Sequence, residues 1–185
     1  FACIAKHKYI VTFEAEKPEK QPDSLTFHFG KDKGDEWVSE SDIVHDFALA
    51  HPDCSFALAN AVMEYLDEKQ HSERNIPELK AGWYKKTDFS ITAVIGGEAF
   101  NYDGRFDIGD GKGTGGGSLI DHIRTYNEGI LGYTQHPFNQ PEYKERAQRM
   151  LDIFVPFLEA YSELTAEEQR IFDDFKAQYP ILTYD

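Results

Sequence analysis

Three aspartates, Asp103, Asp107 and Asp110, lie close together in the sequence. Carboxylate oxygens are the ligands that hard cations such as calcium and magnesium prefer. The spacing of these residues differs from the Asp-x-Asp-x-Asp-Gly loop that binds calcium. The pairs Asp103-Gly104 and Asp110-Gly111 are typical of turns, which require no metal. We therefore expect no metal site and no cofactor, and metal-assisted catalysis through this cluster stays an alternative.

A glycine-rich stretch, GDGKGTGGG, follows these aspartates at residues 109–117. Because it leads into a predicted helix, it could present backbone amides to a phosphate. A phosphate-binding P-loop ends in Gly-Lys-Ser/Thr, whereas this stretch ends in Gly117-Ser118 and holds Lys112 between glycines. We predict instead a flexible loop, formed by Gly109, Gly111, Gly113, Gly115, Gly116 and Gly117.

The chain shows no recognisable motif for nucleophilic or metal catalysis. The seven histidines are scattered, and no serine occupies a Gly-x-Ser-x-Gly turn. The two cysteines, Cys3 and Cys54, match no zinc or redox motif, which favours a reducing compartment. Cys54 is predicted to be a small core residue in an apolar helical stretch. We expect no catalytic residues, and the chain is predicted not to be an enzyme.

The charge balance points to a basic partner. The 185 residues include 33 Asp and Glu against 19 Lys and Arg, which gives a net charge of −14. Free nucleic acid and anionic membrane surfaces are therefore poor partners, because binding them requires cationic side chains. A basic nucleic-acid-binding protein would be attracted at long range. No apolar run approaches membrane-spanning length, and the sequence leaves open whether residues are missing before Phe1.

The C-terminal part concentrates carboxylates along predicted helices. Like charges one turn apart, as at Glu159 and Glu163, cost a helix stability, so a function would explain them. The alternative is a solvated face, with Glu167 and Glu168 placed favourably near a helix N-terminus. We predict a partner-binding surface that imitates a phosphate backbone, with the three aspartates above as a second patch and, as its main residues, Glu159, Glu163, Glu167, Asp173 and Asp174.

The first half of the chain is predicted to form two strands followed by two helices. Lys8–Ala15 and Leu25–Phe29 are predicted strands, because β-branched and aromatic residues dominate the first and apolar residues alternate in the second. Ser39 is predicted to cap one helix, and Pro52-Asp53 to begin another.

The second half is predicted to form a β-meander followed by helices. Strands Phe89–Ile95 and Glu98–Tyr102 are joined by a turn at Gly96-Gly97, and a second turn at Asp103-Gly104 leads to a third strand, Arg105–Ile108. Ser118 and Thr165 are predicted helix caps, and a long helix with a kink at Pro156 spans Pro141–Tyr161. The sequence thus predicts an α+β fold with a small antiparallel meander, packed helices and a helical C-terminal part. Residues 1–80 and 81–185 form either two domains or one composite domain.

Several segments together resemble a known family. Residues 102–111 (YDGRFDIGDG), 118–123 (SLIDHI), 154–158 (FVPFL) and Leu164-Thr165 are similar to a domain of polyvalent proteins from conjugative elements and phages of gut Firmicutes. The resemblance covers residues 83–179, and it attaches no catalytic residues to the family. It implies a counter-defence role in the cytoplasm of a bacterial host, similar to that of anti-CRISPR and antirestriction proteins, some of which mimic DNA.

Charge and resemblance together lead to one main hypothesis and two rivals. The main hypothesis is an acidic inhibitor that binds a CRISPR (RNA-guided) or restriction nuclease and blocks its DNA binding. The first rival is a non-catalytic adaptor of a conjugative element that binds transfer proteins. The second is the metal-assisted enzyme. The oligomeric state and the target are not specified by the sequence.

Overall fold

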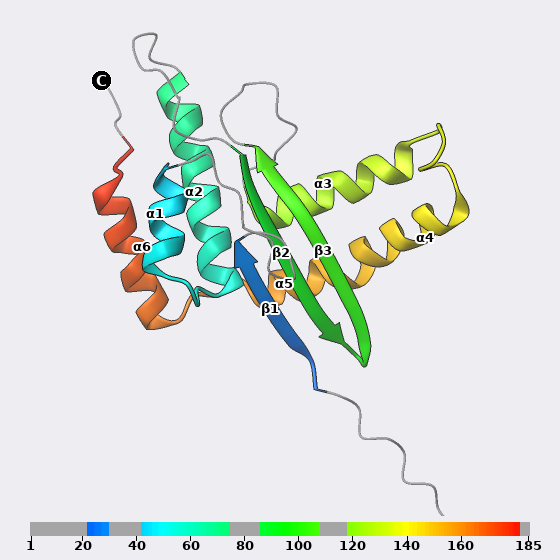
Figure 1. Cartoon of the computed structure of the whole chain (residues 1–185), viewed down its shortest axis with the longest axis horizontal. Helices are drawn as coiled ribbons and strands as arrows, with labels where there is room; N and C mark the ends of the chain where they lie inside the picture. The colour runs from blue at the N-terminus through cyan, green and yellow to red at the C-terminus, as the bar shows by residue number, and fades with distance from the viewer. Residues whose placement is uncertain (1–21, 30–41, 75–85, 108–117, 182–185) are drawn as a thin grey trace, which may run out of the picture.

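The computed structural model describes residues 22–29, 42–74, 86–107 and 118–181. It confirms the predicted α+β class, with a three-stranded antiparallel sheet and helices (Figure 1). The elements, in chain order, are β1 (Ser24–Phe29), α1 (Asp42–Ala50), α2 (Phe56–Arg74), β2 (Lys86–Ile95), β3 (Glu98–Asp107), α3 (Leu119–Gly132), α4 (Pro141–Arg149), the π-helix η1 (Met150–Phe154), α5 (Val155–Ala160) and α6 (Ala166–Gln178).

The sheet is a meander in the order β1-β2-β3. A two-residue turn joins β2 and β3, and its glycines have φ values of 60° at Gly96 and 86° at Gly97. Side chains other than glycine rarely adopt such values, which explains why this turn was predictable from the sequence. The predicted strand Leu25–Phe29 is confirmed as β1, whereas the predicted strand Lys8–Ala15 and the cap at Ser39 lie outside the described residues.

The predicted turn at Asp103-Gly104 is wrong. β3 runs through both residues without interruption, Asp103 pairs with Ser90 and Gly104 pairs with Phe89, so no separate third strand starts at Arg105. A Cβ atom on Gly104 would lie 2.5 Å from Cζ of Phe89. A glycine is therefore needed at this position because the Phe89 ring lies opposite it. The prediction failed because it interpreted the Asp-Gly pair as a turn.

One face of the sheet carries the core. Register places Phe27 opposite Ile91, and Ile91 opposite Tyr102, so that three strands contribute one apolar row. The core combines this face with side chains from α1, α2, α3, η1, α5 and α6. Figure 1 shows α1, α2 and α6 beyond the β1 edge, with α3 and α4 extending past the β3 edge. The division into two domains at residue 80 stays a prediction, although strands from both halves share the sheet.

Helix caps agree largely with the sequence. Ser118 Oγ accepts a hydrogen bond from the Asp121 amide at 3.1 Å, and Thr165 forms a full capping box with Glu168. The start of α2 was predicted wrongly, because Ser55, and not Pro52-Asp53, accepts the helical amide of Leu58. Consequently Cys54 lies in the turn before α2 and not in a helix, although it does pack against the core.

The long C-terminal helical segment contains a π-helix just before Pro156. The predicted helix at Pro141–Tyr161 is present, but α4 passes into the π-helix η1 before α5 begins at Val155. Because proline has no N–H to donate to the preceding turn, a wider local helix just before Pro156 relieves the conflict.

Two hydrogen bonds join α2 to the residues that directly follow α6, the last helix. Tyr65 Oη donates to the Tyr179 carbonyl at 2.6 Å, and Lys69 Nζ donates to the Pro180 carbonyl at 2.8 Å. Lys69 is only 4% exposed, so its charge is stabilised mainly by such contacts. Among the described helices, none has the length and apolar character needed to cross a membrane.

Candidate partner-binding site

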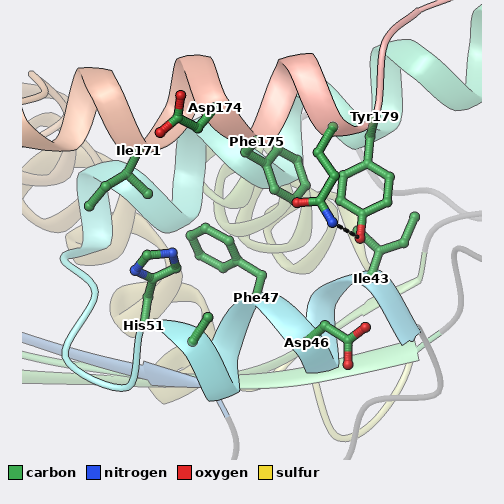
Figure 2. A pocket seen from close by; sticks show the side chains of 10 residues that line it. Ile43, Asp46, Phe47, His51, Ile171, Asp174, Phe175 and Tyr179 are labelled. Atoms are coloured by element: carbon green, nitrogen blue, oxygen red, sulfur yellow. Dashed lines mark hydrogen bonds between the residues drawn. The ribbon is translucent and has the colours of Figure 1, made fainter.

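A groove of about 330 Å³ separates α1 from α6. The two helices come from opposite ends of the chain, and their facing side chains line it (Figure 2). We call this the α1–α6 groove. It brings together apolar residues and carboxylates from both helices.

The floor of the groove is aromatic. The rings of Phe47 on α1 and Phe175 on α6 meet edge to face, with centroids 5.4 Å apart, and each residue is 5% exposed. His51, at the end of α1, packs its ring 4.8 Å from that of Phe47. The floor is therefore preformed by packing that already stabilises the core, and a ligand would meet a fixed surface.

Carboxylates stand on both helices beside this floor. Asp46 lies on α1 and Asp174 on α6, and both line the groove. Glu167 lies two helical turns before Asp174, so it projects from the same side of α6. All three are exposed, and within the part of the chain that the structure describes they form no ion pair. The groove thus combines an apolar floor with the exposed carboxylates of Asp46 and Asp174.

The other predicted C-terminal residues differ in their surroundings. Asp173 accepts hydrogen bonds from Lys176 at 3.1 Å and Gln169 at 3.0 Å, and these contacts lower its pKa, the bond from Lys176 most strongly. Glu159, on α5, is ion-paired with Arg124 on α3. Glu163 lies exposed in the segment between α5, which ends at Ala160, and α6, so the expectation that it stands one helical turn from Glu159 is wrong. Only part of the predicted series is therefore available without breaking an existing contact.

The second predicted patch lies elsewhere. Asp103 is exposed on β3 and lines a different cavity, between β3, α3 and α4. Asp107 ends β3, but its side chain is not described, and Asp110 lies outside the described residues. The six glycines of the predicted flexible loop, Gly109, Gly111, Gly113, Gly115, Gly116 and Gly117, also lie outside them.

Two kinds of observation on the described residues bear on metal binding and catalysis: the grouping of possible metal ligands, and the pKa shifts of Cys54 and Glu64. They contain no group of three or more His, Cys, Asp or Glu side chains placed to hold a metal ion. Burial, and then the charge of Glu168, raise the pKa of Cys54 to about 12, which keeps the thiol protonated. Burial, followed by the charges of Asp121 and Glu68, raises the pKa of Glu64.

The sequence did not identify the α1 side of this site. Asp46, Phe47 and His51 carry no motif, and their role depends on α6 packing beside α1 through contacts between residues more than 100 positions apart. No local signal could have shown which helix lies opposite.

Comparison with known proteins gives one match. The model of the family described as Large polyvalent protein associated domain 25 matches residues 37–139, which is more than half of the chain. The matched region includes α1, α2, β2, β3 and α3, whereas α6 follows it. No curated protein and no solved structure matches the chain.

Proposed function

The chain belongs to the large polyvalent protein associated domain 25 family, and from this premise we propose that it is a non-catalytic, acidic binding module of a mobile genetic element. Its partner is a basic, nucleic-acid-binding protein of the host. The specific proposal is that it binds a CRISPR or restriction nuclease through the α1–α6 groove and blocks the DNA-binding channel of that nuclease.

The groove is the observation that carries this proposal. An apolar floor with carboxylates on two sides is complementary to a segment that is apolar on one face and rich in Lys or Arg on the other. Burying the apolar face contributes affinity, while the carboxylates select a basic partner and accelerate its association. A helix or loop at the rim of a DNA-binding channel has this composition.

Net charge supports the same partner. A charge of −14 attracts a cationic channel over distances beyond direct contact, and salt weakens this attraction. Asp46, Glu167 and Asp174 would then replace some of the phosphates that the channel binds. An inhibitor of this kind needs no catalytic residue, because occupying the channel is sufficient.

A plasmid-interference assay tests the proposal. Cells that carry one defined RNA-guided or restriction nuclease are transformed with a targeted plasmid, with and without co-expression of this chain. We expect co-expression to restore transformation for at least one nuclease. The triple variant Asp46→Lys, Glu167→Lys and Asp174→Lys should abolish this protection, because it reverses the exposed carboxylates of α1 and α6 that lie in or next to the groove.

A matched variant controls for net charge. Glu128→Lys, Glu145→Lys and Asp152→Lys makes the same change of total charge on exposed residues of α3, α4 and η1. It should protect as the unchanged chain does. No protection against any nuclease contradicts inhibition, and equal loss in both triple variants contradicts the groove as the site. Capture of transfer proteins in a host without such nucleases would instead support the adaptor.

A further inference from the structure

A hollow of about 370 Å³ lies between β3, α3 and α4. A second hollow, of about 390 Å³, lies beside α3 and the segment that follows it, and shares His122, Tyr126 and Phe138 with the first. We call the two hollows together the tyrosine cavity. Its volume falls in the range of roughly 300–1,000 Å³ that is usual for small-molecule sites. The α1–α6 groove does not contribute to it.

Aromatic rings surround the tyrosine cavity in two groups. On α3 and β3, Tyr126 and Tyr102 meet edge to face with centroids 6.0 Å apart. Between α3 and α4, the ring of Phe138 lies 5.7 Å from that of Tyr133 and 5.5 Å from that of Tyr143. Tyr126 and Tyr133 are each 50% exposed, so parts of both rings are accessible to a ligand. A planar ligand would find ring surfaces to stack on from both groups.

Charged groups border the same space. Arg105 and Arg146 line it, and both are exposed. Arg105 Nε donates to Asp88 Oδ1 at 2.7 Å, and because the Asp88 side chain is only 2% exposed, this buried carboxylate fixes the guanidinium in place. Nη2 of the same guanidinium donates to Asp88 Oδ2 at 3.3 Å, and the Arg105 side chain as a whole keeps 47% of its surface accessible. Asp103 supplies a carboxylate between these cations in the lining.

From this arrangement we propose that the tyrosine cavity binds a nucleoside monophosphate. The aromatic rings would stack on the base, and stacking on protein aromatics contributes about 1–3 kcal/mol per base. The two guanidinium groups suit a single phosphate, because arginine pairs with phosphate oxygens through paired N–H donors. The Asp103 carboxylate can accept hydrogen bonds from ribose hydroxyls.

The charge of the chain decides between a free nucleotide and a strand. Each further phosphate of a strand would have to approach a protein of net charge −14, whereas one phosphate meets only the two local arginines. The acidic residues near the cavity, among them Asp103, oppose each added phosphate, so we infer that the ligand is a free mononucleotide with one phosphate. Its affinity is expected to be modest, with a Kd of about 0.1–1 mM, because Glu142 and Glu145 border the neighbouring hollow next to Arg146.

Titration of the isotopically labelled full chain, followed by NMR, tests this inference. The probes are AMP, GMP, CMP, UMP, the four nucleosides and inorganic phosphate. We expect at least one monophosphate to shift amide signals of α3 and β3, and to bind about tenfold or more tightly than either its nucleoside or phosphate alone. Tyr126→Ala and Arg146→Gln should each weaken that binding about tenfold.

Matched variants separate binding from folding. Tyr161→Ala removes a tyrosine that is 47% exposed at the end of α5, and Arg170→Gln removes a cation on α6; neither residue lines the cavity. Both should bind the nucleotide normally, as should the triple charge reversal near the α1–α6 groove. The inference is overturned if no monophosphate binds below about 10 mM, if the cavity variants bind normally, or if a single-stranded oligonucleotide binds more tightly than every mononucleotide.

Discussion

The carboxylates of two regions of the structure differ in the ion pairs that they form. In the α3 region (β3, α3, α4, η1 and α5), arginines connect acidic residues across elements: Arg124 bridges Asp121 and Glu159, and Arg149 pairs with Glu98. In the α6 region (α1, α2 and α6), the ion pair between Asp173 and Lys176 joins neighbours on a single helix. Several carboxylates of the α3 region are thus tied to arginines, whereas Asp46 and Asp174 of the α6 region form no ion pair among the described residues.

The same contrast holds for apolar residues. The α3 region surrounds a cavity with exposed tyrosines and arginines, whereas the α6 region closes its aromatic rings into a groove floor. We expect the α6 region to bind a basic protein and the α3 region to bind a small anionic ligand. The variants that follow test whether the two regions can be changed independently.

The largest effect is expected from Gly104→Ala in the α3 region. The new Cβ would lie 2.5 Å from the Phe89 ring and 2.8 Å from that of Tyr102, so the packing of two buried rings must shift. Such overpacking costs about 1–3 kcal/mol of unfolding free energy, which urea denaturation followed by circular dichroism would measure. The unrelated surface change Gly129→Ala should not destabilise, because nothing lies within 4 Å of its added Cβ.

If the regions are independent, the Gly104→Ala protein should keep the partner affinity of the α1–α6 groove at temperatures where it remains folded. Loss of that affinity in the folded variant would show that the two regions act as one.

A smaller effect is expected from Thr165→Ala in the α6 region. Thr165 Oγ1 accepts the Glu168 amide at 3.2 Å, and Glu168 Oε2 accepts the Thr165 amide at 2.8 Å. Removing the hydroxyl should cost about 1 kcal/mol of unfolding free energy and weaken partner binding, because α6 forms one wall of the groove. Thr125→Ala, on the exposed side of α3, serves as the control and should change neither quantity.

Arg124→Gln should make the α3 region more like the α6 region. The substitution leaves Asp121 and Glu159 without their shared cation. Because the arginine is a third exposed, we expect a loss of no more than about 1 kcal/mol of unfolding free energy at low salt. The loss should shrink at high salt, where repulsion between the remaining carboxylates is screened. A loss that is independent of salt would indicate packing by the arginine stem instead.

The smallest effect is expected from Glu64→Gln, where α2 of the α6 region approaches α3. Burial and two neighbouring carboxylates raise the pKa of Glu64 in the folded protein, so its ionised form destabilises the fold at neutral pH. The amide should therefore raise Tm at pH 7. The difference should disappear as the pH falls below about 4.5, where the wild-type carboxyl is protonated in both states. A variant that is less stable at pH 7 would contradict the raised pKa.

Features that depend on local conformation were predictable from the sequence. The turn at Gly96-Gly97 needs positive φ values, and the capping box at Thr165 needs only residues three positions apart. The failures share another cause. Gly104 is fixed by a ring on the neighbouring strand, and Ser55, not the proline before it, provides the first cap of α2. The groove depends on α1 and α6, which are distant in the sequence, packing side by side through Phe47 and Phe175, and no local pattern encodes this.

The most direct test of the account is the affinity of the chain for a nuclease that it inhibits, measured at two salt concentrations. For the triple variant at Asp46, Glu167 and Asp174 we predict a Kd about 100-fold higher than that of the unchanged chain at low salt, and a weaker dependence on salt. The matched variant at Glu128, Glu145 and Asp152 should stay within about threefold of the unchanged chain, because only its long-range attraction falls. Equal affinities for both variants at both salt concentrations would contradict a groove that binds through its carboxylates.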